Sequence, residues 1–308
     1  MDFSVISIYL KNIMSKYFNF FLSEKSKEKV EEIILFIAIG SFLLHLSLVV
    51  LYNSQILKLS ESISMMFSNP ISVIYTPFSF VLFYEFYLLI YYLPKSFTTY
   101  IGKQYEIVTL IIIRRLFKDL SNLEISSDWF RLKNDLQFTY DILSTILLFF
   151  LIYIFYELAK RNFRDVKISK TNITNSIHYF ITFKKIIAIL LVPTLFFMVF
   201  YNSMNWLVHL SSPETPTKNF NNIFFYDFFT VLILVDVLLL LLSFLHTDKF
   251  HKVIRNSGFI ISTILLRLSF TSDGLMSSAL AIGAVSFGIL LLFIHNLYDR
   301  SELLYPME

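Results

Sequence analysis

Long apolar runs separated by short polar segments recur along the whole chain. A run of roughly 20 apolar residues is long enough to cross the hydrocarbon core of a bilayer as a helix. The pattern therefore predicts an all-α polytopic membrane protein with eight transmembrane helices. These predicted spans cover about 33–52, 71–93, 100–117, 139–157, 186–208, 223–245, 257–271 and 274–297.

The third predicted span, 100–117, is the least apolar, and the charges of the loops decide whether it crosses. The N-terminal segment, the segment 158–185 and the turn 246–256 are rich in lysine and arginine. Basic loops stay on the cytoplasmic side, so all three should share one side. That requires residues 100–117 to span fully; an interfacial helix there would put the most basic loop outside. We therefore expect both termini in the cytoplasm. The richness of the chain in Phe, Ile, Asn and Lys indicates an AT-rich bacterial genome, so the expected membrane is a bacterial inner membrane.

The spans divide into two sets of four with similar landmarks. The second span of each set carries one acid at mid-depth, Glu85 or Asp236, and the third carries buried arginine, Arg114 and Arg115 or Arg267. The acid and the arginine are 29 or 30 residues apart in the first set and 31 in the second. This order predicts two four-helix repeats of parallel orientation.

The expected organisation follows from these boundaries. A cytoplasmic amphipathic or interfacial segment precedes two membrane units, which are joined by a basic cytoplasmic linker and followed by a cytoplasmic tail. The corresponding ranges are 1–31 for the first segment, 32–158 and 186–298 for the membrane units, 159–185 for the linker and 299–308 for the tail.

Composition narrows the classes of function. The chain of 308 residues is 56% hydrophobic and only 16% charged, and no polar stretch is long enough for a soluble catalytic domain. Cysteine is absent, and the histidines lack the paired spacing of a helical metal site, so we expect neither a metal nor a cofactor. The net charge of +3 is concentrated in the loops of one side and favours a topological explanation over nucleic-acid binding.

The intramembrane charges are the best candidates for function. An uncompensated charge in the bilayer is costly, so such residues face the bundle interior and pair there. They could form a path in which carboxylates bind a cation or relay protons, or they could only lock helices together. The candidate residues are Glu85, Asp236, Arg114, Arg115, Arg267, Asp141, Asp273 and His45.

Four helices with an acid on the second and buried arginines opposite it resemble a voltage-sensor domain. Neither fourth span carries the arginine ladder of such a sensor, so no family is assigned. The leading hypothesis is a channel or secondary transporter for protons or a small inorganic ion. The alternative is a non-transporting membrane subunit that scaffolds a larger complex or senses voltage or lipid. A lipid-directed enzyme is a third hypothesis, with Asp119, Asp128 and Asp135 as its only polar cluster.

The expected partners are the lipid bilayer itself and a second membrane chain, either another copy or a different protein. Cationic side chains on a cytoplasmic linker are attracted to anionic headgroups within a Debye length of the surface. The residues expected to make this contact are Lys160, Arg161, Arg164, Lys167 and Lys170.

Overall fold

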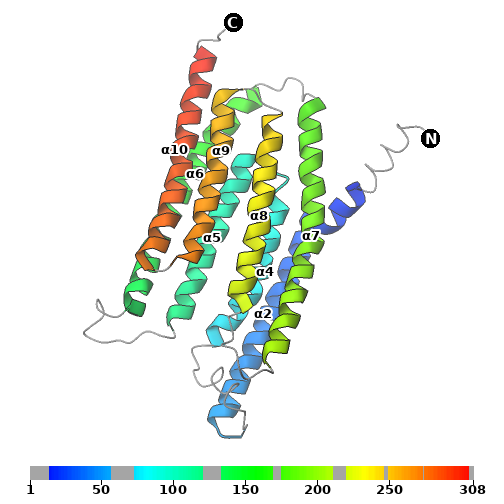
Figure 1. Cartoon of the computed structure of the whole chain (residues 1–308), viewed down its shortest axis with the longest axis vertical. Coiled ribbons are helices and arrows are strands. Elements are labelled where there is room, and N and C mark those ends of the chain that lie inside the picture. Colours follow the sequence, from blue (N-terminus) through cyan, green and yellow to red (C-terminus); the bar gives the residue numbers. More distant parts are fainter. Residues whose placement is uncertain are drawn as a thin grey trace, which may run out of the picture.

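The computed structural model describes residues 14–56, 73–120, 133–168, 175–210, 220–245, 249–272 and 274–304. Within these ranges the chain is helical apart from short turns, and eight long helices lie side by side as one bundle (Figure 1). The helices are α2 (Glu24–Asn53), α4 (Tyr75–Tyr92), α5 (Phe97–Leu120), α6 (Lys133–Ile168), α7 (Asn175–Leu210), α8 (Phe220–Phe244), α9 (Phe250–Leu268) and α10 (Gly274–Leu304).

The helices form two rows of four. In one row α2, α4, α5 and α6 contact each other in chain order, and in the other α7, α8, α9 and α10 do the same. The rows pack face to face through α4 with α7, α5 with α9 and α6 with α10 (Figure 1). The division into two membrane units stays a prediction. The internal repeat itself stays a prediction.

Five helical stretches are long and apolar enough to cross a membrane: Met14–Asn53, Asp135–Lys160, Tyr179–Asn202, Asp227–Phe244 and Gly274–Ser301. The protein is therefore a helical membrane protein. Only 11% to 39% of the apolar window in each of these stretches is buried in the protein, so most of it is free to face lipid. They account for five of the eight predicted spans.

The other three helices, α4, α5 and α9, are extensively covered by protein. Along α5, Tyr100, Gln104 and Tyr105 are almost fully buried, and α9 buries nine of its residues, including Ser262 and Arg267. A helix enclosed by other helices can carry polar groups that a lipid-facing helix cannot. The weakly apolar segment 100–117 thus lies inside α5, which runs alongside α4 and α6 rather than across the end of the bundle (Figure 1).

The ends of several helices extend beyond the predicted spans. Residues 14–22 are helical and belong to the predicted interfacial segment, of which residues 1–13 lie outside the described part. Leu22 is buried there, and Tyr87 of α4 donates a hydrogen bond to the Phe21 carbonyl at 2.7 Å. The predicted linker 159–185 is largely helix, because α6 continues to Ile168 and α7 begins at Asn175.

Small residues bring α9 and α10 close to their neighbours. A methyl group on Gly288 would overlap the Tyr105 hydroxyl, and one on Gly258 would overlap Leu291. Tyr105 is fully buried and its hydroxyl lies 2.6 Å from the Ser262 hydroxyl. The missing side chain at position 288 therefore creates the space for a contact among α5, α9 and α10.

Candidate functional site

The acid of the first row pairs with the first of the two adjacent arginines. Glu85 of α4 accepts a hydrogen bond from Arg114 of α5, and both side chains are buried. Arg114 also donates to the Phe78 carbonyl on α4 at 3.2 Å. This pair compensates two charges that would each cost about 2.5–3.5 kcal/mol at the centre of a membrane helix.

The second arginine turns to a different helix. Arg115 binds both carboxylate oxygens of Asp141 on α6 at 2.6 Å, through Nε and Nη2. Its Nη1 donates to the Ser277 hydroxyl on α10 at 3.0 Å. Asp141 is fully buried and also accepts from Gln137 at 3.0 Å. Arg115 therefore links three helices across both rows.

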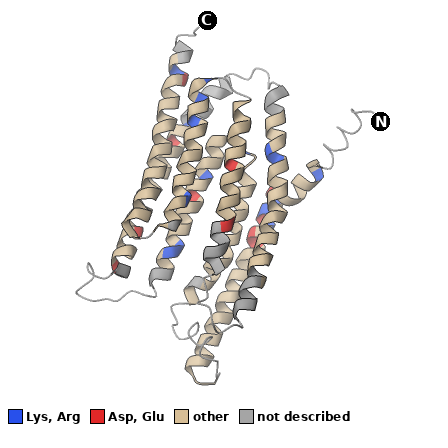
Figure 2. Ribbon diagram, in the orientation of Figure 1, with Lys and Arg blue, Asp and Glu red and all other residues tan. Residues whose placement is uncertain are grey.

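The geometry of α5 explains why adjacent arginines have different partners. Successive residues of an α-helix point about 100° apart, since 3.6 residues complete a turn. Arg114 thus faces α4, while Arg115 faces α6 and α10. The charged positions lie well inside the length of the bundle rather than only at its ends (Figure 2).

The richest polar cluster surrounds Asp236 of α8. Its two oxygens accept from Arg267 of α9 at 2.6 Å and from the Tyr100 hydroxyl of α5 at 2.9 Å. Arg267 donates a further hydrogen bond to Gln104 of α5 at 2.8 Å. Asp236 is fully buried, and Arg267, Tyr100 and Gln104 are each at most 4% exposed. We call these four residues the Asp236 cluster.

Two donors of the Asp236 cluster have no protein acceptor within the described residues. They are Gln104 Nε2 and Arg267 Nη1, both buried. A buried donor without a partner costs roughly 1–3 kcal/mol, so such groups in native proteins are usually satisfied by water or an ion. The cluster can therefore accept a small hydrogen-bond acceptor beside an already neutralised charge pair.

Of the two remaining candidates, only His45 lies within the described residues, and it does not join these pairs. His45 of α2 is half-buried, and its Nδ1 lies 2.5 Å from the Thr76 hydroxyl of α4, an interhelical contact away from the arginines. Asp273 lies outside the described residues. Sequence reasoning missed Tyr100 and Gln104. Their spacing of four residues puts them on one face of α5. That spacing identifies them as site residues only when it is known that α8 and α9 pack against this face.

A further buried charge lies in the segment for which the sequence predicts a basic cytoplasmic linker. Lys184 lies in α7, is 2% exposed and donates to the Lys95 carbonyl at the end of α4, at 2.6 Å. Its ammonium lies 4.9 Å from the ring centre of Phe97 and 5.6 Å from that of Phe180. A carbonyl at a helix end and two aromatic rings are all favourable partners for a cation.

The predicted headgroup contacts are only partly within the described side chains. Lys160 is exposed at the end of an apolar stretch and pairs with Glu157 at 2.7 Å. Arg161, Arg164 and Lys167 lie on the continuation of α6, and Lys170 lies outside the described residues. Contact of this region with anionic lipid stays a prediction.

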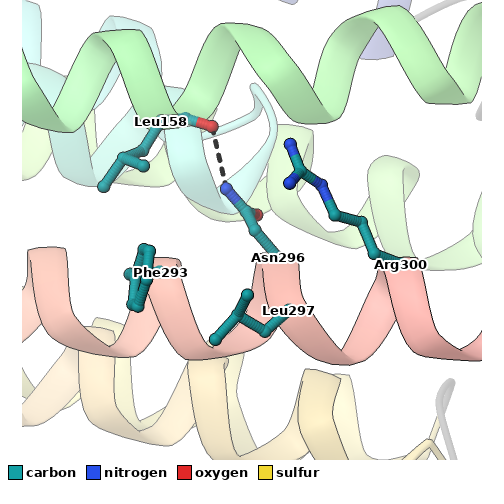
Figure 3. A pocket seen from close by; sticks show the side chains of 5 residues that line it. All are labelled: Leu158, Phe293, Asn296, Leu297 and Arg300. Atoms are coloured by element: carbon teal, nitrogen blue, oxygen red, sulfur yellow. Dashed lines mark hydrogen bonds between the residues drawn. The ribbon is translucent and has the colours of Figure 1, made fainter.

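A shallow cleft lies between α6 and α10 (Figure 3). Asn296 donates across it to the Leu158 carbonyl at 3.0 Å, and Arg300 rises from the same face of α10. The free space is about 20 Å³, room for about one water molecule. The cleft is therefore too small to be a substrate chamber.

No known family, no curated protein and no solved structure matches the chain. Its class rests on the fold and the buried charges. It is a helical membrane protein in which three arginine–carboxylate pairs within the described residues join neighbouring helices.

Proposed function

We propose that the protein moves protons or a small inorganic ion across the membrane, with the Asp236 cluster as the central polar site. The observation that carries the proposal is the pair of buried donors without a protein acceptor, on Gln104 and Arg267. Such donors can hydrogen-bond to water, which relays protons, or to a small anion. A purely structural ion pair gains nothing from spare donors, because each one adds a desolvation cost.

The other two pairs support a polar path through the same helices. Glu85–Arg114 and Asp141–Arg115 both involve α5, as does the Asp236 cluster through Tyr100. A movement of α5 would therefore change the environment of all three carboxylates together. In this proposal the pairs exchange partners when α5 shifts, and an ion or proton replaces an arginine on a carboxylate.

A second candidate, a non-transporting scaffold or sensor subunit, is favoured by a different observation. Each of the three carboxylates is held by an arginine through direct hydrogen bonds and is at most 3% exposed. Closed pairs of this kind lock helices in register. The broad apolar outer surface would then contact a partner chain as well as lipid.

Flux into liposomes separates the two functions. Purified protein is reconstituted, and proton entry is followed with an internal pH-sensitive dye under an imposed potential; Na⁺, K⁺ and Cl⁻ gradients are tested in parallel. Transport predicts flux above that of protein-free liposomes and its loss in Asp236→Asn. The matched control is Lys160→Gln, which alters an exposed pair and should keep the flux.

The flux of wild type and variant distinguishes a transporter from a scaffold. Flux that disappears in Asp236→Asn while the variant keeps its helix content supports transport. Absence of flux for every ion, together with a stoichiometric membrane partner recovered in mild detergent, refutes it and supports the scaffold.

A further inference from the structure

The ends of α9 and α10 bring two histidines and an aspartate together, far along the helices from the arginine pairs. His251 comes from α9, and His295 and Asp299 from α10. The spacing of four residues puts His295 and Asp299 on one face of α10. One donor atom from each residue lies within 4.8 Å of the other two.

Both imidazoles converge on the same carboxylate. His251 Nε2 lies 2.9 Å from one oxygen of Asp299, and His295 Nε2 lies 3.4 Å from the other. The two rings are stacked, with their centres 5.0 Å apart. Both histidines are buried, at 6% and 2% exposure, while the Asp299 side chain is 32% exposed. A metal ion could therefore reach the two buried histidine nitrogens from the side of Asp299, which is partly exposed.

We propose that His251, His295 and Asp299 form a binding site for a divalent transition-metal ion, with Zn²⁺ as the best match. Two nitrogens and one carboxylate oxygen are a standard zinc set, and water supplies the fourth ligand where the protein provides three. Imidazole donors disfavour Mg²⁺ and Ca²⁺, which take oxygen ligands. Tetrahedral ligands of zinc lie about 3.3 Å apart, so the donors need to close by at most about 1.5 Å.

The protonation pattern of His295 fits a ligand. Arg255 Nη1 lies 2.7 Å from His295 Nε2, and a guanidinium can only donate. Nε2 therefore carries a lone pair in this structure, which is the form that binds a metal. The opposite nitrogen, Nδ1, is buried without a hydrogen-bond partner among the described residues.

Arg255 and the metal would compete for the same lone pair. The guanidinium also holds Asn256 through hydrogen bonds of 3.1 and 3.2 Å, so it has a second anchor on α9 when it leaves His295. A positive side chain beside the site lowers its affinity for a cation. Metal binding should therefore move Arg255 and tie α9 to α10 at this end of the bundle.

Zinc titration of the full-length protein in detergent tests the site, with a purification tag that contains no histidine. Isothermal calorimetry should give one Zn²⁺ per chain and no binding of Mg²⁺. His295→Gln and Asp299→Asn should each weaken zinc binding by about 100-fold or more. Loss of a residue that only hydrogen-bonds to a metal ligand usually costs about 10- to 100-fold. Arg255→Gln should tighten it by about tenfold. His45→Gln is the matched control and should leave it unchanged.

X-ray absorption of the zinc-loaded wild type keeps the test independent of variant folding. The expected ligands are two histidine nitrogens and two oxygens, one from Asp299 and one from water. Zinc that binds equally well to His295→Gln and Asp299→Asn, or an absorption spectrum without histidine ligands, overturns the proposal. Because neither measurement depends on flux, failure here is distinguishable from failure of the transport proposal.

Discussion

The Asp236–Arg267 pair gives the sharpest test of how the buried charges stabilise the bundle. Asp236→Asn keeps the shape of the side chain and removes its charge, which leaves Arg267 buried at 4% exposure without its counter-ion. Removing one member of a buried pair costs about 3–5 kcal/mol, most of it from the stranded charge. We expect a loss of this size in the free energy of unfolding for Asp236→Asn and for Arg267→Gln.

The double variant Asp236→Asn/Arg267→Gln should be far less damaged than the sum of the two. It strands no charge, and its amides can still bond with each other and with Tyr100. A coupling energy of about 2 kcal/mol or more should result. Neutral hydrogen bonds between membrane helices average only about 0.6 kcal/mol, so the difference is measurable.

Reversible unfolding in mixed detergent and SDS micelles, followed by far-ultraviolet circular dichroism, provides the free energies. The exposed pair Glu157–Lys160 serves as the control cycle, since its side chains are 42% and 70% exposed. It should yield at most about 1 kcal/mol. Single-variant losses below about 1 kcal/mol at the buried pair, or strict additivity of the two, would refute this account of the bundle.

Further predictions concern packing, the second arginine and zinc. Gly288→Ala should destabilise the protein by about 1–3 kcal/mol, because the methyl group displaces the rigid Tyr105 ring, whereas Gly283→Ala, with open space around it, should be neutral or stabilising. The same unfolding assay measures both. Arg115→Lys should cost about 1.5–3 kcal/mol, because lysine cannot bind both oxygens of Asp141; an unchanged unfolding curve would contradict this. Zinc at about 100 times its dissociation constant should stabilise the wild type by about 2.7 kcal/mol, and a chelator should reverse the shift.

The pairing of charges shows where reasoning from sequence stops. The cost of a lone charge in lipid indicates that Glu85 and Asp236 need arginine partners, and the structure gives them Arg114 and Arg267. The preference of Arg115 for Asp141 depends on how α6 is rotated against α5. Hydrophobic patterning does not encode that rotation, because it arises from side-chain packing between helices.

The histidine cluster shows the same limit more strongly. His251 and His295 are 44 residues apart and have no recognisable spacing relative to each other. Only the spacing from His295 to Asp299 is visible on one helix, and many polar pairs share it. The packing of α9 on α10 brings the third ligand, which no periodicity in the chain predicts.

The sequence alone determined that this is a helical membrane protein and where most of its helices lie, because helix length and apolarity are local responses to a bilayer. It also located the costly charges. Tertiary structure decided that the two sets of four helices pack as facing rows and that α4, α5 and α9 are covered by protein. These arrangements arise from contacts between residues far apart in the sequence. For the same reason, the least apolar segment, 100–117, lies in α5, the helix that takes part in all three arginine–carboxylate clusters.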